Sequence, residues 1–296
     1  MTLIIAGYNN SNSIFFAADT AISSGTSTLL CEFRKVYSVS VKLWEPYFVR
    51  EYFKDYSSVY MESQCAVAFA GSTLTAQHIL NSISEHLANL RISISYEQLG
   101  VNSKHRRYVI VKPCERNELM DLSRVRMWAD DMFTHDNCKN LLTADYIAET
   151  IEHSINHAVR SARKYKLDSD SFNSLLTNFA AGIRCPITGE FCLYVFHMQE
   201  RYGEGGVREA YTSKELIANS RIAVLGLKER FEANAQAHFD DAKAKSQNLP
   251  TAMFEYLNEA IDIIKAEGGR SIDRPAVLKI FDERGVRTIQ RRPEHK

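Results

Sequence analysis

Two periodicities of apolar residues divide the chain into strands and helices. Short apolar runs at residues 3–7 and 14–18, separated by the polar residues 9–12, predict two strands joined by a turn. Residues 35–41 show strand-like alternation, and residues 65–70 are continuously apolar, which is typical of a buried strand. We therefore expect four strands before residue 71.

Apolar residues at helical spacing predict four helices, and these fall into two pairs. The helices are expected at about 74–90, 146–159, 228–246 and 250–266. In the first of them, Leu74 and Leu90 are expected to belong to the apolar stripe. Further strands are predicted at 175–183, 191–198, 210–211, 222–225, 277–281 and 286–289.

The order of these elements predicts an α+β fold. Strands, two helices, strands, two helices and strands suit two stacked antiparallel sheets with helices on both outer faces. Residues about 42–62 and 92–143 fit neither period well, apart from a strand at 108–111, and we interpret them as insertions. A chain of 296 residues is within reach of one such domain, so a single domain over residues 1–296 is predicted.

Composition argues against two classes of partner and favours one cellular compartment. Lys and Arg together number 36, as do Asp and Glu, so the clustered positive charge that nucleic acid or an anionic membrane needs is not indicated. No apolar run is long enough to cross a bilayer. The six cysteines are scattered without metal-binding spacing, which favours a reduced, cytoplasmic protein.

Three segments carry a resemblance to a known family. Thr2 leads the first strand, which is followed by Phe16-Ala17-Ala18-Asp19-Thr20. Arg34-Lys35-Val36-Tyr37 comes next, and then Phe69-Ala70-Gly71-Ser72-Thr73. In order and spacing these segments resemble the catalytic β-type subunits of the proteasome and their bacterial relatives, which are N-terminal-nucleophile (Ntn) hydrolases.

The resemblance implies a fold and a set of catalytic residues. It implies a four-layer α/β/β/α sandwich of two antiparallel sheets. It also implies that Thr2 is the nucleophile and Lys35 an ammonium beside it. Asp19 would then hold Lys35 in place, and Gly71 would offer its backbone N–H to the oxyanion.

An N-terminal threonine can act as nucleophile and base together. Its hydroxyl attacks a carbonyl while its own α-amine takes the proton. The amine must be free, so we expect Met1 to be removed; a small residue at position 2 permits this. A free α-amine titrates near 8, and a neighbouring ammonium such as that of Lys35 lowers this value further.

The resemblance also implies a substrate and an assembly. The residues expected to line the pocket for the side chain before the cut bond are Ile22, Phe33, Phe69 and Thr73. Their character predicts an apolar preference. The expected function is cleavage of peptide or amide bonds within a ring or stack of identical subunits, acting on peptides or unfolded protein, with an unfoldase partner left open.

Three positions depart from the family pattern and keep two alternatives open. Leu227 follows Gly226 where the family usually has a serine. Lys265 and Gly268 occupy positions where the family usually has an aspartate and, three residues later, a serine. The chain could thus be a catalytically silent proteasome-like structural or binding protein, or an Ntn amidase acting on a small amide.

A histidine pair in the second helix is the candidate metal site. His153 and His157 stand four residues apart, one turn after Glu149, a spacing that can bind a metal. Glu152, Arg160 and Arg163 nearby favour a solvated helix face instead. We therefore predict neither a metal nor a cofactor.

Overall fold

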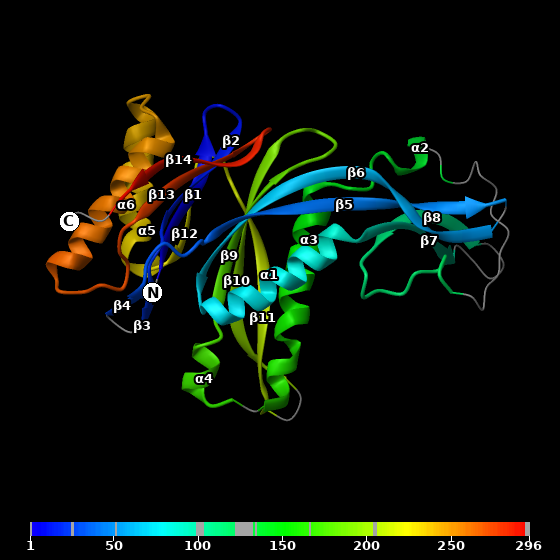
Figure 1. Ribbon diagram of the computed structural model, residues 1–296, viewed down its shortest axis with the longest axis horizontal. Coiled ribbons are helices and arrows are strands. Elements are labelled where there is room, and N and C mark those ends of the chain that lie inside the picture. The colour runs from blue at the N-terminus through cyan, green and yellow to red at the C-terminus, as the bar shows by residue number, and fades with distance from the viewer. Residues whose placement is uncertain are drawn as a thin grey trace.

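The computed structural model describes residues 2–24, 27–50, 52–98, 104–121, 133, 135–165, 167–203 and 206–293. Within these residues the protein is a mixed α+β fold, as predicted, built on two larger sheets and one small hairpin. One pair of long helices lies at the left of the view and the other pair near its middle, with strands between them (Figure 1).

The smaller of the two larger sheets contains both chain ends that the structure describes. Its antiparallel order is β12 (Ala223–Gly226), β1 (Leu3–Asn9), β2 (Ser13–Asp19), β13 (Ala276–Asp282) and β14 (Gly285–Arg292). Two helices, α5 (Lys228–Ala244) and α6 (Leu249–Ala266), pack on one of its faces. The strand pair β3 (Ile22–Ser24) and β4 (Ser27–Leu30) forms a separate hairpin after β2.

The larger sheet carries the middle of the chain. Its order is β11 (Arg208–Ile217), β10 (Phe191–Tyr202), β9 (Thr177–Arg184), β6 (Tyr52–Gly71), β5 (Val36–Val49), β7 (Leu90–Gln98) and β8 (Lys104–Val111). The pairs are antiparallel except β5 with β7. Helices α1 (Thr73–Ala88) and α3 (Ala144–Val159) pack together over one face of this sheet.

The continuously apolar strands are explained by burial on both faces. Leu3 and Ile5 of β1 point to the α5–α6 side, while Ile4 and Ala6 point to a core between the two sheets. In β6, residues 65, 67 and 69 face the helices α1 and α3, and the alanines 66, 68 and 70 face the other sheet. Small alanine side chains on this inner face allow the sheets to approach closely.

Residues 42–62 extend the long hairpin of β5 and β6, and this long hairpin was not predicted. The strands run past α1 and α3 to one end of the molecule, where β7 and β8 lie beside them (Figure 1). Aromatic residues of this extension pack with Ile94 and Leu119 into a small core of their own. The rings in contact are those of Phe48, Phe53, Tyr56, Tyr108 and Phe133.

The predicted helices and most of the predicted strands are confirmed to within a few residues, and further corrections concern single elements. Leu74 is 84% exposed at the start of α1, and Leu90 begins β7 instead of ending the helix. The strand predicted at 210–211 is the ten-residue β11. The short elements α2 (His135–Cys138), η3 (Arg160–Tyr165) and α4 (Ser169–Asn173) were missed, because segments of one turn carry too little periodicity. Among the described residues, no helix has the length and apolar character needed to span a membrane.

Candidate active site

Thr2 is fixed by the strand that it leads. It is 6% exposed and directly precedes β1, which pairs with β12 through Leu3 and Gly226. The Thr2 carbonyl accepts a hydrogen bond from the Leu227 N–H at 3.0 Å. Gly226 has φ +89°, and a Cβ there would overlap the Thr2 carbonyl oxygen. Only glycine therefore allows β12 to approach Thr2 this closely.

Asp19 ends β2 and points back to the start of β1. It is fully buried. Its Oδ1 accepts the Leu3 N–H at 2.9 Å, and its Oδ2 accepts the Ala21 N–H at 3.2 Å. The antiparallel pairing of β1 with β2 produces this geometry, because it sets Ile4 opposite Ala18 and so brings the end of β2 to the beginning of β1.

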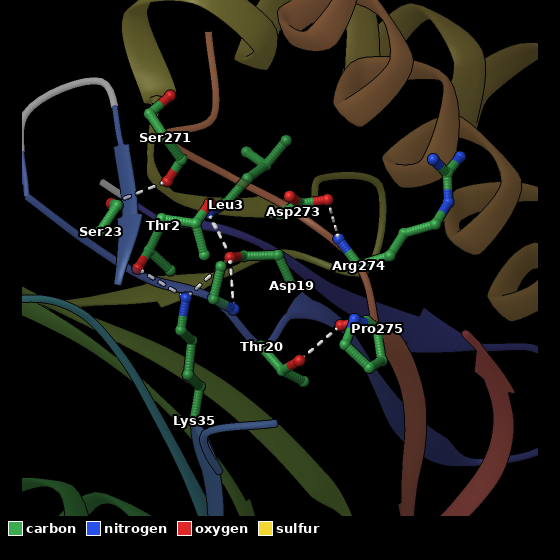
Figure 2. A network of polar contacts seen from close by, with 12 residues as sticks. Thr2, Leu3, Asp19, Thr20, Ser23, Lys35, Ser271, Asp273, Arg274 and Pro275 are labelled. Atoms are coloured by element: carbon green, nitrogen blue, oxygen red, sulfur yellow. Dashed lines mark hydrogen bonds and ion pairs between the residues drawn. The ribbon is translucent and has the colours of Figure 1, made fainter. Parts of the chain in front are cut away.

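Lys35 joins Thr2 to Asp19 (Figure 2). Its Nζ is 2.9 Å from Thr2 Oγ1 and 2.9 Å from Asp19 Oδ2, and the residue is 4% exposed. It stands just before β5, where its carbonyl accepts the Phe69 N–H. Because an ammonium only donates, Thr2 Oγ1 accepts from Lys35, and the threonine proton remains for another base.

Burial and ion pairing act in opposite directions on the Asp19 carboxyl. Burial raises its pKa, whereas the Lys35 ammonium and the two backbone N–H donors favour the ionised form. An ion pair this far from water persists because both charges are also hydrogen-bonded. Removal of either partner would leave the other charge buried without its counterion.

Gly71 and Phe69 lie on the strand next to Lys35. Phe69 donates to the Lys35 carbonyl, and Gly71 follows two residues later at the end of β6. Gly71 is exposed and has φ +134°, and a Cβ there would overlap the Leu176 carbonyl oxygen. Gly71 directly precedes Ser72, the N-cap of α1.

Of the four predicted pocket residues, Phe33, Phe69 and Thr73 lie at this strand end. Phe69 is 2% exposed, and its ring lies 6.1 Å, centroid to centroid, from the half-buried ring of Phe33. Ile22, on β3, and Thr73, the first residue of α1, are both half-buried. Phe69 is thus more deeply buried than Ile22, Phe33 and Thr73. A separate cavity of about 660 Å³, lined by Tyr8 and Leu216 among others, contains none of these residues.

Several residues that hold the site in place were not found from the sequence. Thr20 donates through its hydroxyl to the Pro275 carbonyl at 2.6 Å, and Ser23 donates to the Ser271 carbonyl at 2.9 Å (Figure 2). Asp273 is 3% exposed and pairs with Lys265 at 2.5 Å. The contacts of Thr20 and Ser23 join residues 255 and 248 positions apart, so no local pattern could have predicted these two.

The three departures from the family pattern have different structural consequences. Leu227 binds the Thr2 carbonyl through its backbone N–H, which any residue except proline could supply. The Lys265 ammonium is engaged by Asp273. Gly268 lies just after the C-cap of α6, has φ +80°, and a Cβ added there would meet no other atom within 4 Å.

The interpretation of His153 and His157 as a solvated pair is wrong for His153. His157 is exposed, but His153 is half-buried, and both rings contact the ring of the buried His86 at 5.5 Å. Glu149 is turned toward Lys214 instead. Ligand atoms of His86, Cys114 and His153 all lie within 4.8 Å of one another, so this cluster could hold a metal ion.

Comparison with known proteins adds no family to this description. No protein-family model matches the chain, and no curated protein matches it significantly. The functional argument therefore depends on the site geometry itself.

Proposed function

We propose that this protein is an N-terminal threonine hydrolase of the Ntn type that cleaves peptide or amide bonds in the cytoplasm. One observation carries the proposal: Lys35 Nζ lies 2.9 Å from both Thr2 Oγ1 and Asp19 Oδ2 in a buried site. Burying the Lys35 ammonium beside the Thr2 hydroxyl costs free energy of desolvation. We take this cost as support for a functional role of the ammonium. Three of the four predicted catalytic residues, Thr2, Asp19 and Lys35, thus share one contact network, although they come from three separate segments.

The proposed reaction begins after removal of Met1. The α-amine of Thr2 takes the hydroxyl proton while Oγ1 attacks the substrate carbonyl. Lys35 stabilises the developing alkoxide, and Asp19 keeps Lys35 charged and oriented. The amine then gives its proton to the leaving nitrogen, the C–N bond breaks, and an ester to Thr2 forms. Water hydrolyses this ester and restores the hydroxyl.

Gly71 is proposed to bind the oxyanion through its backbone N–H. Its place at the end of β6, directly before a helix N-terminus, suits a developing negative charge. Loss of such a donor typically raises the barrier by about 3–4 kcal/mol. Ile22, Phe33, Phe69 and Thr73 would line the adjoining pocket and favour an apolar residue before the cut bond.

The same proposal extends to the fold and the assembly. Helices α5 and α6 on one sheet, helices α1 and α3 on the other, and an apolar core between the sheets support the four-layer α/β/β/α sandwich of Ntn hydrolases. We expect identical subunits to associate through the helical layers in a ring or stack that admits peptides or unfolded protein.

A catalytically silent proteasome-like protein is the second candidate. It is favoured by the absence of family side chains at Leu227, Lys265 and Gly268, and by the engagement of Lys265 with Asp273. An Ntn amidase for a small amide is a third reading, which activity on small amides without activity on peptides would support.

Intact mass spectrometry separates the first two candidates. The enzyme should lose Met1 and gain one adduct from a threonine-directed peptide electrophile. Thr2→Ala should abolish the adduct, whereas Thr251→Ala, which changes an exposed helical threonine, should leave it intact. A folded protein whose Thr2 is free but unreactive would refute the hydrolase proposal. In a peptide-library profile, cleavage mainly after acidic or basic residues would refute the apolar pocket.

A further inference from the structure

Three elements converge on a cluster of histidine and cysteine outside the proposed active site. His86 comes from the last turn of α1, His153 from α3, and Cys114 from the loop that follows β8. Cys114 Sγ is 3.1 Å from His153 Nε2, and ligand atoms of all three residues lie within 4.8 Å of one another. Helices α1 and α3 pack against each other and cross in the view (Figure 1).

The hydrogen bonds around His86 determine which ring nitrogen can bind a metal. Ser154 Oγ donates its single proton to the Thr150 carbonyl at 2.6 Å. Ser154 Oγ must therefore accept at its 2.8 Å contact with His86 Nδ1, so the neutral ring carries its proton on Nδ1. The lone pair is then on Nε2. Metal-binding histidines usually donate their other N–H in this way, which fixes the ring.

The charges around the cluster suit neutral imidazole ligands. Burial lowers the pKa of His86 and of His153, and the nearby Lys112 ammonium acts in the same direction. Neutral histidine is the form that binds metal. Lys112 would also repel a cation, but its Nζ is paired with Glu115 at 2.8 Å. The exposed ring of His157 is stacked with that of His153, with ring centroids 6.1 Å apart.

We propose that His86, Cys114 and His153 form a Zn²⁺ site with one further position for water. Among the common divalent ions, zinc is the one that imidazole nitrogen and thiolate sulfur typically bind. With Zn–S of about 2.3 Å and Zn–N of about 2.0 Å, sulfur and nitrogen stand about 3.5 Å apart in a tetrahedron. Cys114 Sγ lies 3.1 Å from His153 Nε2, and all three ligand atoms lie within 4.8 Å of one another. Because these separations bracket the value of about 3.5 Å, small side-chain rotations suffice to place the ligand atoms around a zinc ion.

The site would tie the long β-extension to the helical layer. The loop that carries Cys114 also carries Asn117, which accepts from Ser93 Oγ at 2.7 Å and donates to Tyr56 Oη at 2.8 Å. Ser93 belongs to β7 and Tyr56 to β6. A metal bound by Cys114, His86 and His153 thus connects these strands to α1 and α3 through one short loop.

The test uses the full-length protein without a histidine tag. After incubation with Zn²⁺ and removal of excess metal, elemental analysis should find about one zinc per chain, as expected for one three-residue site. Co²⁺ should bind in its place and give a near-ultraviolet thiolate charge-transfer band. His86→Ala, Cys114→Ser and His153→Ala should each lose the bound zinc, and Cys114→Ser should also lose the band.

Matched controls come from the same chain. His78→Ala changes an exposed histidine of α1, and Cys31→Ser changes another exposed cysteine; both should retain zinc. Circular dichroism verifies that each variant is folded. Ser154→Ala should keep the site but weaken zinc affinity about 10- to 100-fold, as loss of an outer hydrogen bond does. Absence of stoichiometric zinc in the wild type, or its retention in Cys114→Ser, would overturn the proposal.

Discussion

Substitution of Lys35 by methionine tests whether the buried ion pair exists in solution. The change removes the ammonium but keeps most of the side-chain volume. Asp19 would remain fully buried, with the Leu3 and Ala21 N–H groups as its remaining donors. Breaking a buried pair on one side typically costs about 3–5 kcal/mol. The two remaining hydrogen bonds place the expected loss near the lower limit, about 3 kcal/mol.

Chemical denaturation and thermal melting measure this loss. For a protein of this size, about 3 kcal/mol corresponds to a melting temperature lower by roughly 6–12 °C. The double variant Asp19→Asn with Lys35→Met leaves neither charge unpaired, and it should recover about 2 kcal/mol relative to the sum of the single variants. Lys42→Met is the control, because Lys42 forms a partly exposed pair with Glu62 and should change stability by less than about 0.5 kcal/mol.

In these variants, stability reports whether the ion pair is buried, and labelling of Thr2 reports whether Lys35 takes part in the chemistry. Folded Lys35→Met should also fail to react with the threonine-directed electrophile, since Thr2 loses its contact with the ammonium. A loss below about 1 kcal/mol, typical of an exposed pair, would refute the buried arrangement. A normal loss of stability with unchanged labelling would instead show that Lys35 is structural and that the proposed chemistry is wrong.

Two other predictions follow from the backbone and from histidine burial. Gly226→Ala should destabilise the protein and abolish labelling of Thr2. The control Gly268→Ala, also at positive φ but with open space for a Cβ, should lower the free energy of unfolding by only about 1 kcal/mol and keep labelling. Equal melting temperatures and equal labelling of the two variants would contradict this. Burial lowers the pKa of His86 and His153, so the unfolded chain binds protons that the folded chain does not. In chelator-treated protein the free energy of unfolding should therefore fall as pH decreases below about 6.5. Denaturant titrations of His86→Leu should show a weaker dependence on pH. An unchanged slope of the free energy of unfolding against pH would contradict this.

The sequence alone predicted most of the fold because burial leaves a local signature. Strand β1 and residues 65–70 of β6 are covered on both faces and form continuous apolar runs, and α3 shows its buried stripe at helical spacing. The long extension of β5 and β6 escaped prediction, because its aromatic and polar residues pack in a small, partly exposed core that has no clear period. Single-turn helices escaped for the related reason that they are too short.

The candidate catalytic residues could be named from motif order, but their contact could not be derived from it. Thr2, Asp19 and Lys35 lie in three segments up to 33 residues apart, and the two 2.9 Å contacts exist only because β1 and β2 pair while β5 begins beside them. Gly226 allows the close approach of β12 to Thr2, which is more than 220 positions away in the sequence.

The histidine and cysteine cluster marks the limit of what the sequence determines. Spacing along α3 suggested His153 with His157, because residues four apart share a helix face. The structure instead groups His153 with His86 and Cys114, which arrive from another helix and a loop. Local periodicity fixes which face of an element is buried, whereas only the packing of elements decides which side chains from distant segments meet.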